Sequence, residues 1–174
     1  MFLYRDTLSE DLPSICSLPQ SEEELFYMFP SATFPLQERQ MKEILKKREG
    51  HTTFLYDDEI IGYANLYRFK DDDTPYIGHL ILSKKYRGRG FGKEIIRIMI
   101  RKAYLLYKSN KIKIAVINEN THAFLLYTKL GFYPFKASLR FDKKREQKVL
   151  ISMEMDLFEA IDDEKLQEVC VETH

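Results

Sequence analysis

The chain has 174 residues, 27 Lys or Arg against 27 Asp or Glu, and a hydrophobic fraction of 44%. This length fits one domain with a real core, and zero net charge gives no global reason to expect a nucleic acid or an anionic membrane as partner. The 2 cysteines cannot form a disulfide framework or a metal cluster, and the sequence has neither a signal peptide nor an apolar run near the ~20 residues of a membrane span. We therefore expect a cytoplasmic protein without a metal site.

The first half of the chain alternates between predicted helices and strands. The helices, the first two opened by a serine and the third ended by Gly50, are expected over Ser9–Leu18, Ser21–Met28 and Gln37–Glu49. The strands are expected over Phe2–Tyr4, His51–Tyr56, Ile60–Phe69 and Tyr76–Leu82. Turns at Asp57-Asp58 and over Asp71–Pro75 separate the last three strands.

After Leu82 the pattern changes to a loop, a long helix, a strand and a second helix. The apolar residues of Gly90–Lys108 recur every three or four positions, as in an amphipathic helix. The other elements are expected over Lys111–Ile117, over Asn120–Leu130 closed by Gly131, over Phe132–Phe141 and over Lys148–Leu157. The sum is an α+β domain of three layers, residues 1–157, with helices flanking a mixed sheet of about seven strands. Residues 158–174 are expected to form an acidic helix or tail.

Positive charge concentrates between Lys84 and Lys113, where eleven Lys or Arg residues stand against one acid, Glu94. A local positive field on a neutral chain favours one anionic ligand, with a solvated helix face as the alternative. Within this stretch, a glycine-rich motif follows a strand and opens a helix: Arg87, Gly88, Arg89, Gly90, Phe91 and Gly92. Glycines let the backbone approach a ligand, and a helix N-terminus offers unpaired N–H donors with partial positive charge. The motif therefore predicts a diphosphate site, with a ligand-free turn as the alternative.

Three known phosphate loops compete for this motif. The spacing fails the nucleotide P-loop and the dinucleotide fingerprint. The order Arg-x-x-Gly-x-Gly instead matches the GNAT superfamily of N-acetyltransferases, and a second GNAT-like signature follows at Asn120, Ala123, Tyr127 and Gly131-Phe132. The chain resembles this family over residues 76–133. The resemblance implies a GNAT-like, mostly antiparallel sheet, acetyl-CoA (coenzyme A) as co-substrate and an amine as acetyl acceptor.

The resemblance also implies roles for individual residues. The backbone of Leu80, Ile81 and Leu82 would line the pantetheine arm, and an N–H group near Leu82, at a bulge, would polarise the thioester carbonyl. The diphosphate would be held by N–H groups of Arg87, Gly88, Arg89, Gly90, Phe91, Gly92 and Lys93. Asn120 would contact the pantetheine or a structural water, and Tyr127 would act as general acid.

The spacing of Asn120 and Tyr127 supports this assignment, because seven residues are about two helical turns and place both on one helix face. The alternatives are a helix N-cap for Asn120 and a core position for Tyr127. The general base departs from the family pattern, since its usual carboxylate positions hold Tyr76 and Ala115. His79, Glu119 or a chain of waters remain as candidates.

The acceptor is expected in a cleft between the first helices and the later strands. Its lining would comprise Glu22–Glu24, Phe26, Tyr27, Phe29 and Pro30–Pro35, with Tyr133–Phe135 opposite. Acids and aromatic rings suit a cationic amine, through cation–π contact among other forces. A small metabolite, an antibiotic-like amine and a protein or peptide amine all remain open, as do a monomer and a homodimer.

Two other classes of function compete with an N-acetyltransferase. A non-catalytic sensor that binds acyl-CoA would explain the missing carboxylates but not the retained Tyr127. A nucleic-acid-binding helix over Arg87–Lys113 has suitable charge, yet no base-reading motif accompanies it. We therefore expect no nucleic acid and no membrane as partner.

Overall fold

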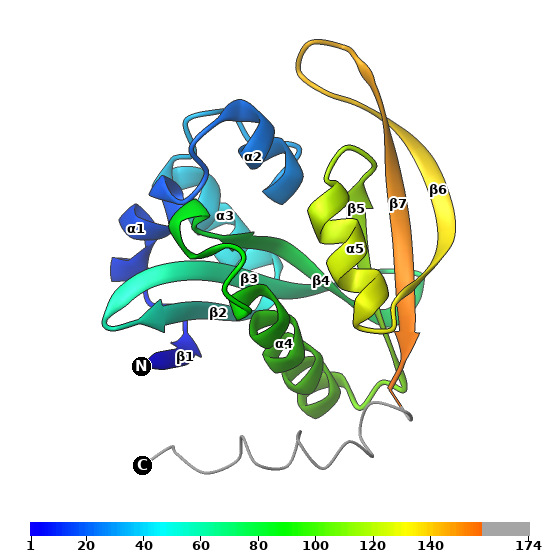
Figure 1. Cartoon of the computed structure of the whole chain (residues 1–174), viewed down its shortest axis with the longest axis horizontal. Helices are drawn as coiled ribbons and strands as arrows, with labels where there is room; N and C mark the ends of the chain where they lie inside the picture. The colour runs from blue at the N-terminus through cyan, green and yellow to red at the C-terminus, as the bar shows by residue number, and fades with distance from the viewer. Residues whose placement is uncertain (158–174) are drawn as a thin grey trace.

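The computed structural model describes residues 1–157 and shows a seven-stranded sheet with five α-helices (Figure 1). The strands are β1 (Phe2–Asp6), β2 (Glu49–Tyr56), β3 (Glu59–Phe69), β4 (Asp72–Leu82), β5 (Lys111–Ile117), β6 (Tyr133–Phe141) and β7 (Gln147–Asp156). The helices are α1 (Leu12–Ser17), α2 (Glu22–Met28), α3 (Glu38–Lys47), α4 (Phe91–Tyr107) and α5 (Thr121–Lys129). The predicted α+β fold is confirmed.

The strands lie in the order β1-β2-β3-β4-β5-β7-β6. Neighbouring strands are antiparallel except β4 and β5, which run parallel. Parallel neighbours need a crossover connection, and α4 supplies it between β4 and β5. The predicted mixed, mostly antiparallel sheet is confirmed.

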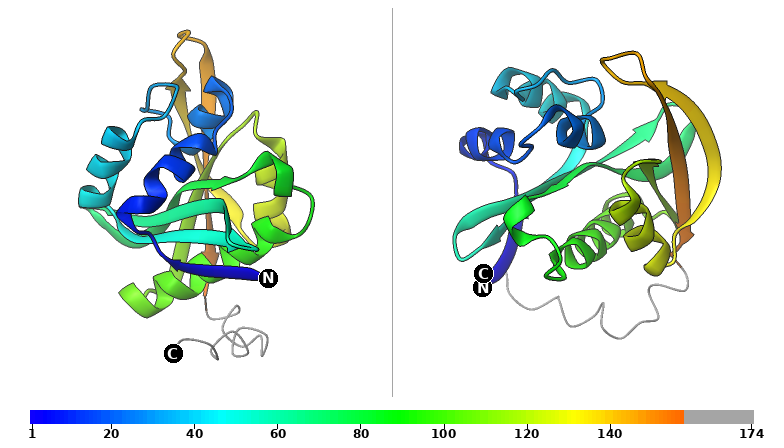
Figure 2. Two further views of the ribbon diagram at one scale, coloured as in Figure 1. Left: turned by 90° about the vertical axis from the view of Figure 1, so that its left-hand side faces the viewer. Right: turned by 45° about the horizontal axis from the view of Figure 1, so that its top comes forward.

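Helices cover both faces of the sheet and divide the core in two (Figure 2). On one face α4 and α5 pack through a cluster that includes Ile95, Met99 and Tyr127. On the other face α1, α2 and α3 pack through a second cluster that includes Leu12, Met41, Tyr63 and Ile81. We call these the α4 face and the α3 face. The central strands β3 and β4 contribute to both clusters, so they connect the two parts of the core.

Several local signals behave as the sequence predicts. Ser21 caps α2, since its hydroxyl accepts the Glu24 N–H at 3.1 Å. Gly131 ends α5 with a φ of 101°, and the Phe132 N–H donates to the Tyr127 carbonyl at 3.0 Å, as in a Schellman motif. The Asp57-Asp58 turn between β2 and β3 has positive φ at both residues, which is typical of a tight hairpin turn.

Two predicted boundaries in the N-terminal part are wrong. Ser9 does not cap a helix, because a 3-10 turn over Ser9–Asp11 comes first and α1 begins at Leu12. Proline is tolerated in the first helical turn and disrupts the interior, so Pro13 favours this late start. Gly50 does not end α3 either. It lies inside β2 with a φ of 59°, where a register shift marks a bulge that glycine accommodates.

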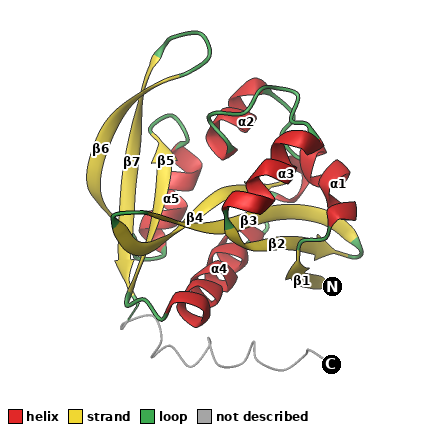
Figure 3. Ribbon diagram, turned by 180° about the vertical axis from the view of Figure 1, so that it is seen from behind, coloured by secondary structure: helices red, strands yellow, loops and turns green. Residues whose placement is uncertain are grey.

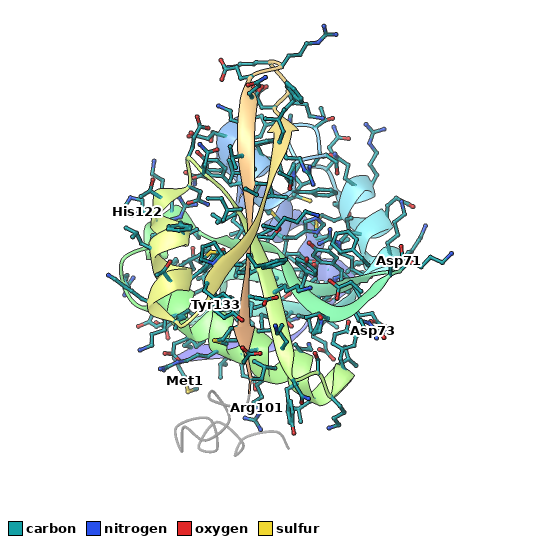
Figure 4. The ribbon with its side chains drawn as sticks, turned by 90° about the vertical axis from the view of Figure 1, so that its right-hand side faces the viewer. Met1, Asp71, Asp73, Arg101, His122 and Tyr133 are labelled. Carbon is teal, nitrogen blue, oxygen red and sulfur yellow. The ribbon has the colours of Figure 1, made fainter. Side chains whose placement is uncertain are left out.

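The predicted turn over Asp71–Pro75 is also wrong, because β4 begins at Asp72. The register between β3 and β4 shifts between Tyr67 and Phe69, and this irregular stretch of β4 contains Pro75, which has no N–H to donate. Asp71 and Asp73 flank the first residue of β4. Both lie on the opposite side of the molecule from His122 of α5 (Figure 4).

Within residues 1–157, no helix combines the length and the apolar character that crossing a membrane requires. The same residues contain no group of His, Cys, Asp and Glu arranged to hold a metal ion. The acidic helix or tail expected over 158–174 lies outside the described residues.

Candidate active site

The two parallel strands β4 and β5 separate soon after they begin. Among the described residues, their registered pairs are Tyr76 with Lys113 and Ile77 with Ile114. Beyond these pairs the strands diverge (Figure 3), although β3 and β7 continue to pair on their outer sides. The second half of β4 therefore presents an unpaired edge toward β5, and we call the space between them the β4–β5 gap.

A bulge in β4 lies beside this gap. Between two registered pairs, β3 advances two residues from Tyr63 to Asn65 while β4 spans three from Gly78 to Ile81. The extra residue falls next to His79, whose φ of 46° lies in the left-handed region. The bulge thus occurs earlier in β4 than the position near Leu82 that the resemblance implies.

The backbone of Leu82 nevertheless faces the gap. The next residue, Ser83, donates its N–H to the Ile61 carbonyl of β3 at 2.7 Å. Because backbone groups alternate in direction along a strand, the N–H and C=O of Leu82 point away from β3. Consistent with this direction, the Leu82 carbonyl accepts a bond from Arg87 Nε at 3.0 Å.

The glycine-rich loop between β4 and α4 exposes a run of backbone donors. The amide N–H groups of residues 88–92 find no acceptor among the described residues, and the next N–H, that of Lys93, donates to the Gly90 carbonyl at 3.1 Å. Gly88 and Gly90 have φ values of 74° and 89°, and a Cβ added at either would meet no atom within 4 Å. The glycines are therefore required by backbone conformation, and the space in front of the loop is open.

Side chains fix this loop from behind. The Arg87 guanidinium pairs with the Glu24 carboxylate of α2 at 2.8 Å. The Arg89 guanidinium lies 5.3–5.6 Å from the ring centroids of Tyr56, Tyr86 and Phe91. Both arginines thereby hold the loop in place, while its backbone amides stay available for a ligand.

Tyr127 lies beside the loop on α5. A Cβ added at Gly92 would lie 3.1 Å from Leu126 Cδ2, so α5 packs directly against the start of α4. The Tyr127 side chain is only 5% exposed, and its ring centroid is 6.2 Å from that of Phe132. Burial raises the pKa of Tyr127, and its hydroxyl has no hydrogen-bond partner among the described residues. The hydroxyl oxygen itself is not fully enclosed by the described residues, so a ligand can reach it.

The asparagines at the start of α5 have structural roles. Asn120 is the N-cap, and its side-chain oxygen accepts the Ala123 N–H at 3.4 Å. Asn118 instead accepts the Val149 N–H of β7 at 2.9 Å. The structure thus shows the capping alternative for Asn120, and its contact with a pantetheine arm or a water stays a prediction.

His79 is held in a polar network on the α3 face. Its Nδ1 accepts a bond from Asn65 Nδ2 at 3.0 Å, and its ring centroid is 4.2 Å from that of Phe29. Burial, with Arg48 and His51 nearby, lowers the pKa of His79 to about 2. The imidazole is therefore neutral near pH 7, with Nδ1 already occupied, and this environment argues against a general base at His79.

A cavity of about 330 Å³ opens at the end of β5, where Glu119 follows the strand. Its lining combines two aromatic rings with five carboxylates and three lysines: Glu22, Glu23, Phe26, Tyr27, Glu119, Asp142, Lys143, Lys144, Glu146 and Lys148. The predicted wall is present in part: Glu22, Glu23, Phe26 and Tyr27 line this cavity, whereas Glu24, Phe29 and Pro30–Pro35 do not. The opposite wall is the hairpin loop between β6 and β7, rather than Tyr133–Phe135, because that hairpin rises beside α2 (Figure 1).

Comparison with known proteins identifies the family. Residues 12–132 match the family described as Acetyltransferase (GNAT) family. The chain belongs to the GNAT acetyltransferase family. The match includes the β4–β5 gap, the glycine-rich loop and all of α5.

A curated relative of this GNAT protein is the spermine/spermidine N(1)-acetyltransferase of Bacillus subtilis (strain 168). It is 27% identical over 96 residues, which make up 52% of this chain and 62% of the relative. The aligned region thus spans less than two thirds of that relative's length.

Solved structures with the same fold include N-acetyltransferases. The ribosomal-protein-S18-alanine N-acetyltransferase from Escherichia coli superimposes with a TM-score of 0.71 at 16% identity, covering 90% of this chain and 94% of that one. A spermidine N-acetyltransferase SpeG chimera from Vibrio cholerae and hSSAT gives 0.73 at 23% identity, covering 92% and 98%. At these identities the structures establish the shared fold.

Sequence reasoning did not find the network around Arg48, Asn65 and His79. These residues come from the end of α3, from β3 and from β4, and the register of the two strands brings them together. The available signals were weak: a polar Asn65 within an apolar strand and Gly78 before a strand histidine.

Proposed function

We propose that this GNAT protein transfers the acetyl group of acetyl-CoA to a primary amine in one direct step. The observation that carries the proposal is the presence of backbone N–H groups without acceptors in two parts of the site. The first part is residues 88–92, and the second is Leu82, whose N–H points away from β3 into the β4–β5 gap. A diphosphate fits the first part and an extended pantetheine arm fits the second, because both bind through backbone groups.

Acetyl-CoA supplies an activated thioester, and the protein contributes positioning and hydrogen bonds. The amine nitrogen forms a bond to the thioester carbonyl carbon, and the carbon–sulfur bond breaks. The Leu82 N–H would donate to the carbonyl oxygen as it gains charge, which is a contribution of about 3 kcal/mol for one such donor. With both substrates bound side by side, positioning supplies much of the rate.

Tyr127 is the proposed general acid for the departing thiolate. Burial keeps its hydroxyl protonated at neutral pH, and no protein acceptor in the described part of the chain competes for that proton. A tyrosine hydroxyl can protonate a thiolate in a somewhat uphill transfer, and the same apolar surroundings destabilise the thiolate. The proton and the leaving sulfur thereby end as a neutral thiol.

Glu119, rather than His79, is the proposed acceptor of the amine proton, directly or through a water. Glu119 lies in the cavity at the open end of the gap and pairs with Lys148 at 2.8 Å, with 45% of its side chain exposed. His79 is neutral but buried, and its pKa of about 2 gives it little affinity for a proton.

The acceptor enters through the cavity in this proposal. Its five carboxylates exceed its three lysines, and Phe26 and Tyr27 add aromatic surface, so the lining favours an amine that is cationic in solution. Spermine and spermidine belong in any first panel because a curated relative is named for them.

The test combines binding and turnover. Acetyl-CoA should raise the melting temperature, and release of free thiol should then follow addition of an amine from a panel of polyamines, amino acids and peptides. Stabilisation without thiol release from any amine would favour a non-catalytic acyl-CoA sensor. Absence of stabilisation by acetyl-CoA would refute the coenzyme site itself.

A further inference from the structure

The guanidinium of Arg48 has an unusual environment in this protein. Arg48 follows α3, is half-buried, and lies 4.0 Å from the ring centroid of Tyr67. Within residues 1–157 its guanidinium donates one hydrogen bond, from Nη1 to the neutral Asn65 Oδ1 at 3.1 Å. Its other N–H groups find no acceptor among residues 1–157, so the guanidinium keeps most of its donors available.

Several other cations on the described part of the chain pair with carboxylates. Examples are Arg5 with Asp11, Lys102 with Asp6, Lys113 with Asp72 and Lys148 with Glu119. Arg48 has no such pair among the described residues. Because taking a charge out of water without a partner is unfavourable, a half-buried arginine of this kind calls for an anionic partner from outside the chain.

Two arginines act on the aromatic side chains beside this guanidinium. Arg48 and Arg140 both act electrostatically on Tyr67, and Arg48 also acts on His79. Together they define what we call the Arg48 pocket wall: Arg48, Asn65, Tyr67, His79 and Arg140. A wall with this charge attracts an anion and repels an amine that carries positive charge alone.

The position of Arg48 connects it with the reaction. A Cβ added at Gly78 would overlap the guanidinium and lie 2.7 Å from Tyr67 Cε1, so Arg48 rests directly on β4. Gly78 precedes the bulge at His79, beside the β4–β5 gap. An anion held by Arg48 would therefore lie against the strand whose far end, at Leu82, is proposed to bind the thioester carbonyl.

We infer that Arg48 binds a carboxylate of the acceptor, so that the acceptor is a primary amine that also carries a carboxylate, such as an amino acid. This inference rests on the proposed function. Arginine suits a carboxylate because its planar fork offers two parallel N–H donors. The acid-rich cavity would then bind the ammonium group of the acceptor, and the Arg48 pocket wall would bind its carboxylate.

The experiment compares amines that differ only in a carboxylate: L-lysine with cadaverine, L-ornithine with putrescine, and L-tyrosine with tyramine. Thiol release gives kcat/KM, and calorimetric titration into the coenzyme A complex gives binding. We expect at least one carboxylate-bearing member to exceed its partner about 10-fold. Arg48→Gln should remove this advantage by lowering kcat/KM of the carboxylate-bearing member, whereas kcat/KM of the decarboxylated partner should not fall, because the substitution also removes a charge that repels a cationic amine. Arg48→Lys, which keeps the charge without the fork, should restore only part of it.

Exposed Arg39 of α3 provides the matched control, since Arg39→Gln removes an arginine from the same helix and should change neither member of a pair. Equal or better use of the decarboxylated amines, or an equal loss for both members in Arg48→Gln, would overturn the inference while acetyl transfer stands. Carboxylate binding that depends on Arg48, without acetyl transfer, would support the site and refute the proposed function.

A final arm separates the two possible sources of the carboxylate. Succinyl-CoA and acetyl-CoA are compared as donors to cadaverine, because a dicarboxylic acyl group would also bring a carboxylate to the β4–β5 gap. A preference for succinyl-CoA that Arg48→Gln abolishes would assign the arginine to the acyl group and overturn its assignment to the acceptor.

Discussion

The coenzyme side and the acceptor side of β4 recognise their ligands in different ways. On the coenzyme side, the loop at Gly88 and Gly90 offers backbone N–H groups and leaves open space in front of them. On the proposed acceptor side, recognition would depend on side chains such as Arg48 and Glu119, which come from separate elements. A backbone site requires a particular local conformation, whereas a side-chain site requires the whole sheet to be assembled first.

The largest expected loss comes from Gly90→Asp on the coenzyme side. The φ of 89° is strained for aspartate, and a carboxylate would face the diphosphate, so affinity for acetyl-CoA should fall roughly 100-fold or more. Calorimetric titration measures this affinity. Gly90→Asn is the matched control, because it keeps the shape without the charge and should lose clearly less. Equal affinity of the aspartate variant and the wild type would exclude the loop as the diphosphate site.

Tyr127→Phe should cause the second-largest loss, because Tyr127 lies between the proposed coenzyme side and the proposed acceptor side. Loss of the proposed acid should lower kcat about 100-fold and leave the dissociation constant of acetyl-CoA nearly unchanged. The phenyl ring preserves packing against Phe132, so the melting temperature should change little. A wild-type kcat would remove the acid role from Tyr127.

Glu119→Gln tests the acceptor side, and we expect it to lower kcat/KM at pH 7 about 10-fold. Loss of the proposed base should lower kcat/KM at pH 7, and the deficit should shrink toward pH 10, where an alkyl amine is deprotonated in solution. Glu146→Gln is the control, since Glu146 lines the same cavity and pairs with the same Lys148. An equal, pH-independent loss in both variants would show that only the charge of the cavity matters.

The smallest effect concerns stability. The folded state holds the pKa of His79 near 2, against about 6.5 when unfolded, so below pH 6.5 the unfolded chain binds more protons. The free energy of unfolding should therefore be fully retained above pH 6.5 and fall by about 1 kcal/mol between pH 6.5 and 5.5. The pKa of His51 is also lowered and adds a change of the same sign.

Urea unfolding at several pH values measures this slope. His79→Asn should flatten it, since asparagine tolerates positive φ and does not titrate. An unchanged slope in this variant would assign the pH dependence to other groups.

The predictability of each side follows the same physical division. The glycine-rich loop and the Gly131 terminus were predictable, because left-handed backbone and helix ends select residue types over a few positions. The start of β4 was not, since Asp72 and Pro75 resemble turn residues until the pairing with β3 is known. The capping role of Asn120 and a core position for Tyr127 were both foreseen as alternatives, but which of them occurs depends on how α5 packs.

The Arg48 pocket wall could not be predicted from the sequence, because its contacts join residues that are far apart along the chain. Its contact with Asn65 links residues 17 apart, and the Asn65–His79 contact links residues 14 apart. The Asn65–His79 contact also crosses the bulge that offsets β4 against β3. Neither the bulge nor the left-handed His79 has a local signature, because a positive φ is uncommon at any residue other than glycine.

The brief pairing of β4 with β5 also affects the mechanics of the molecule. Two registered pairs join the four strands β1–β4 to the three strands β5, β7 and β6, so the sheet has a seam across its middle. A flexible chain lying in that seam would form hydrogen bonds with backbone groups of both β4 and β5, much as an additional strand would. Bound substrate would then link the two halves of the sheet, and these halves would be held together most strongly during the reaction.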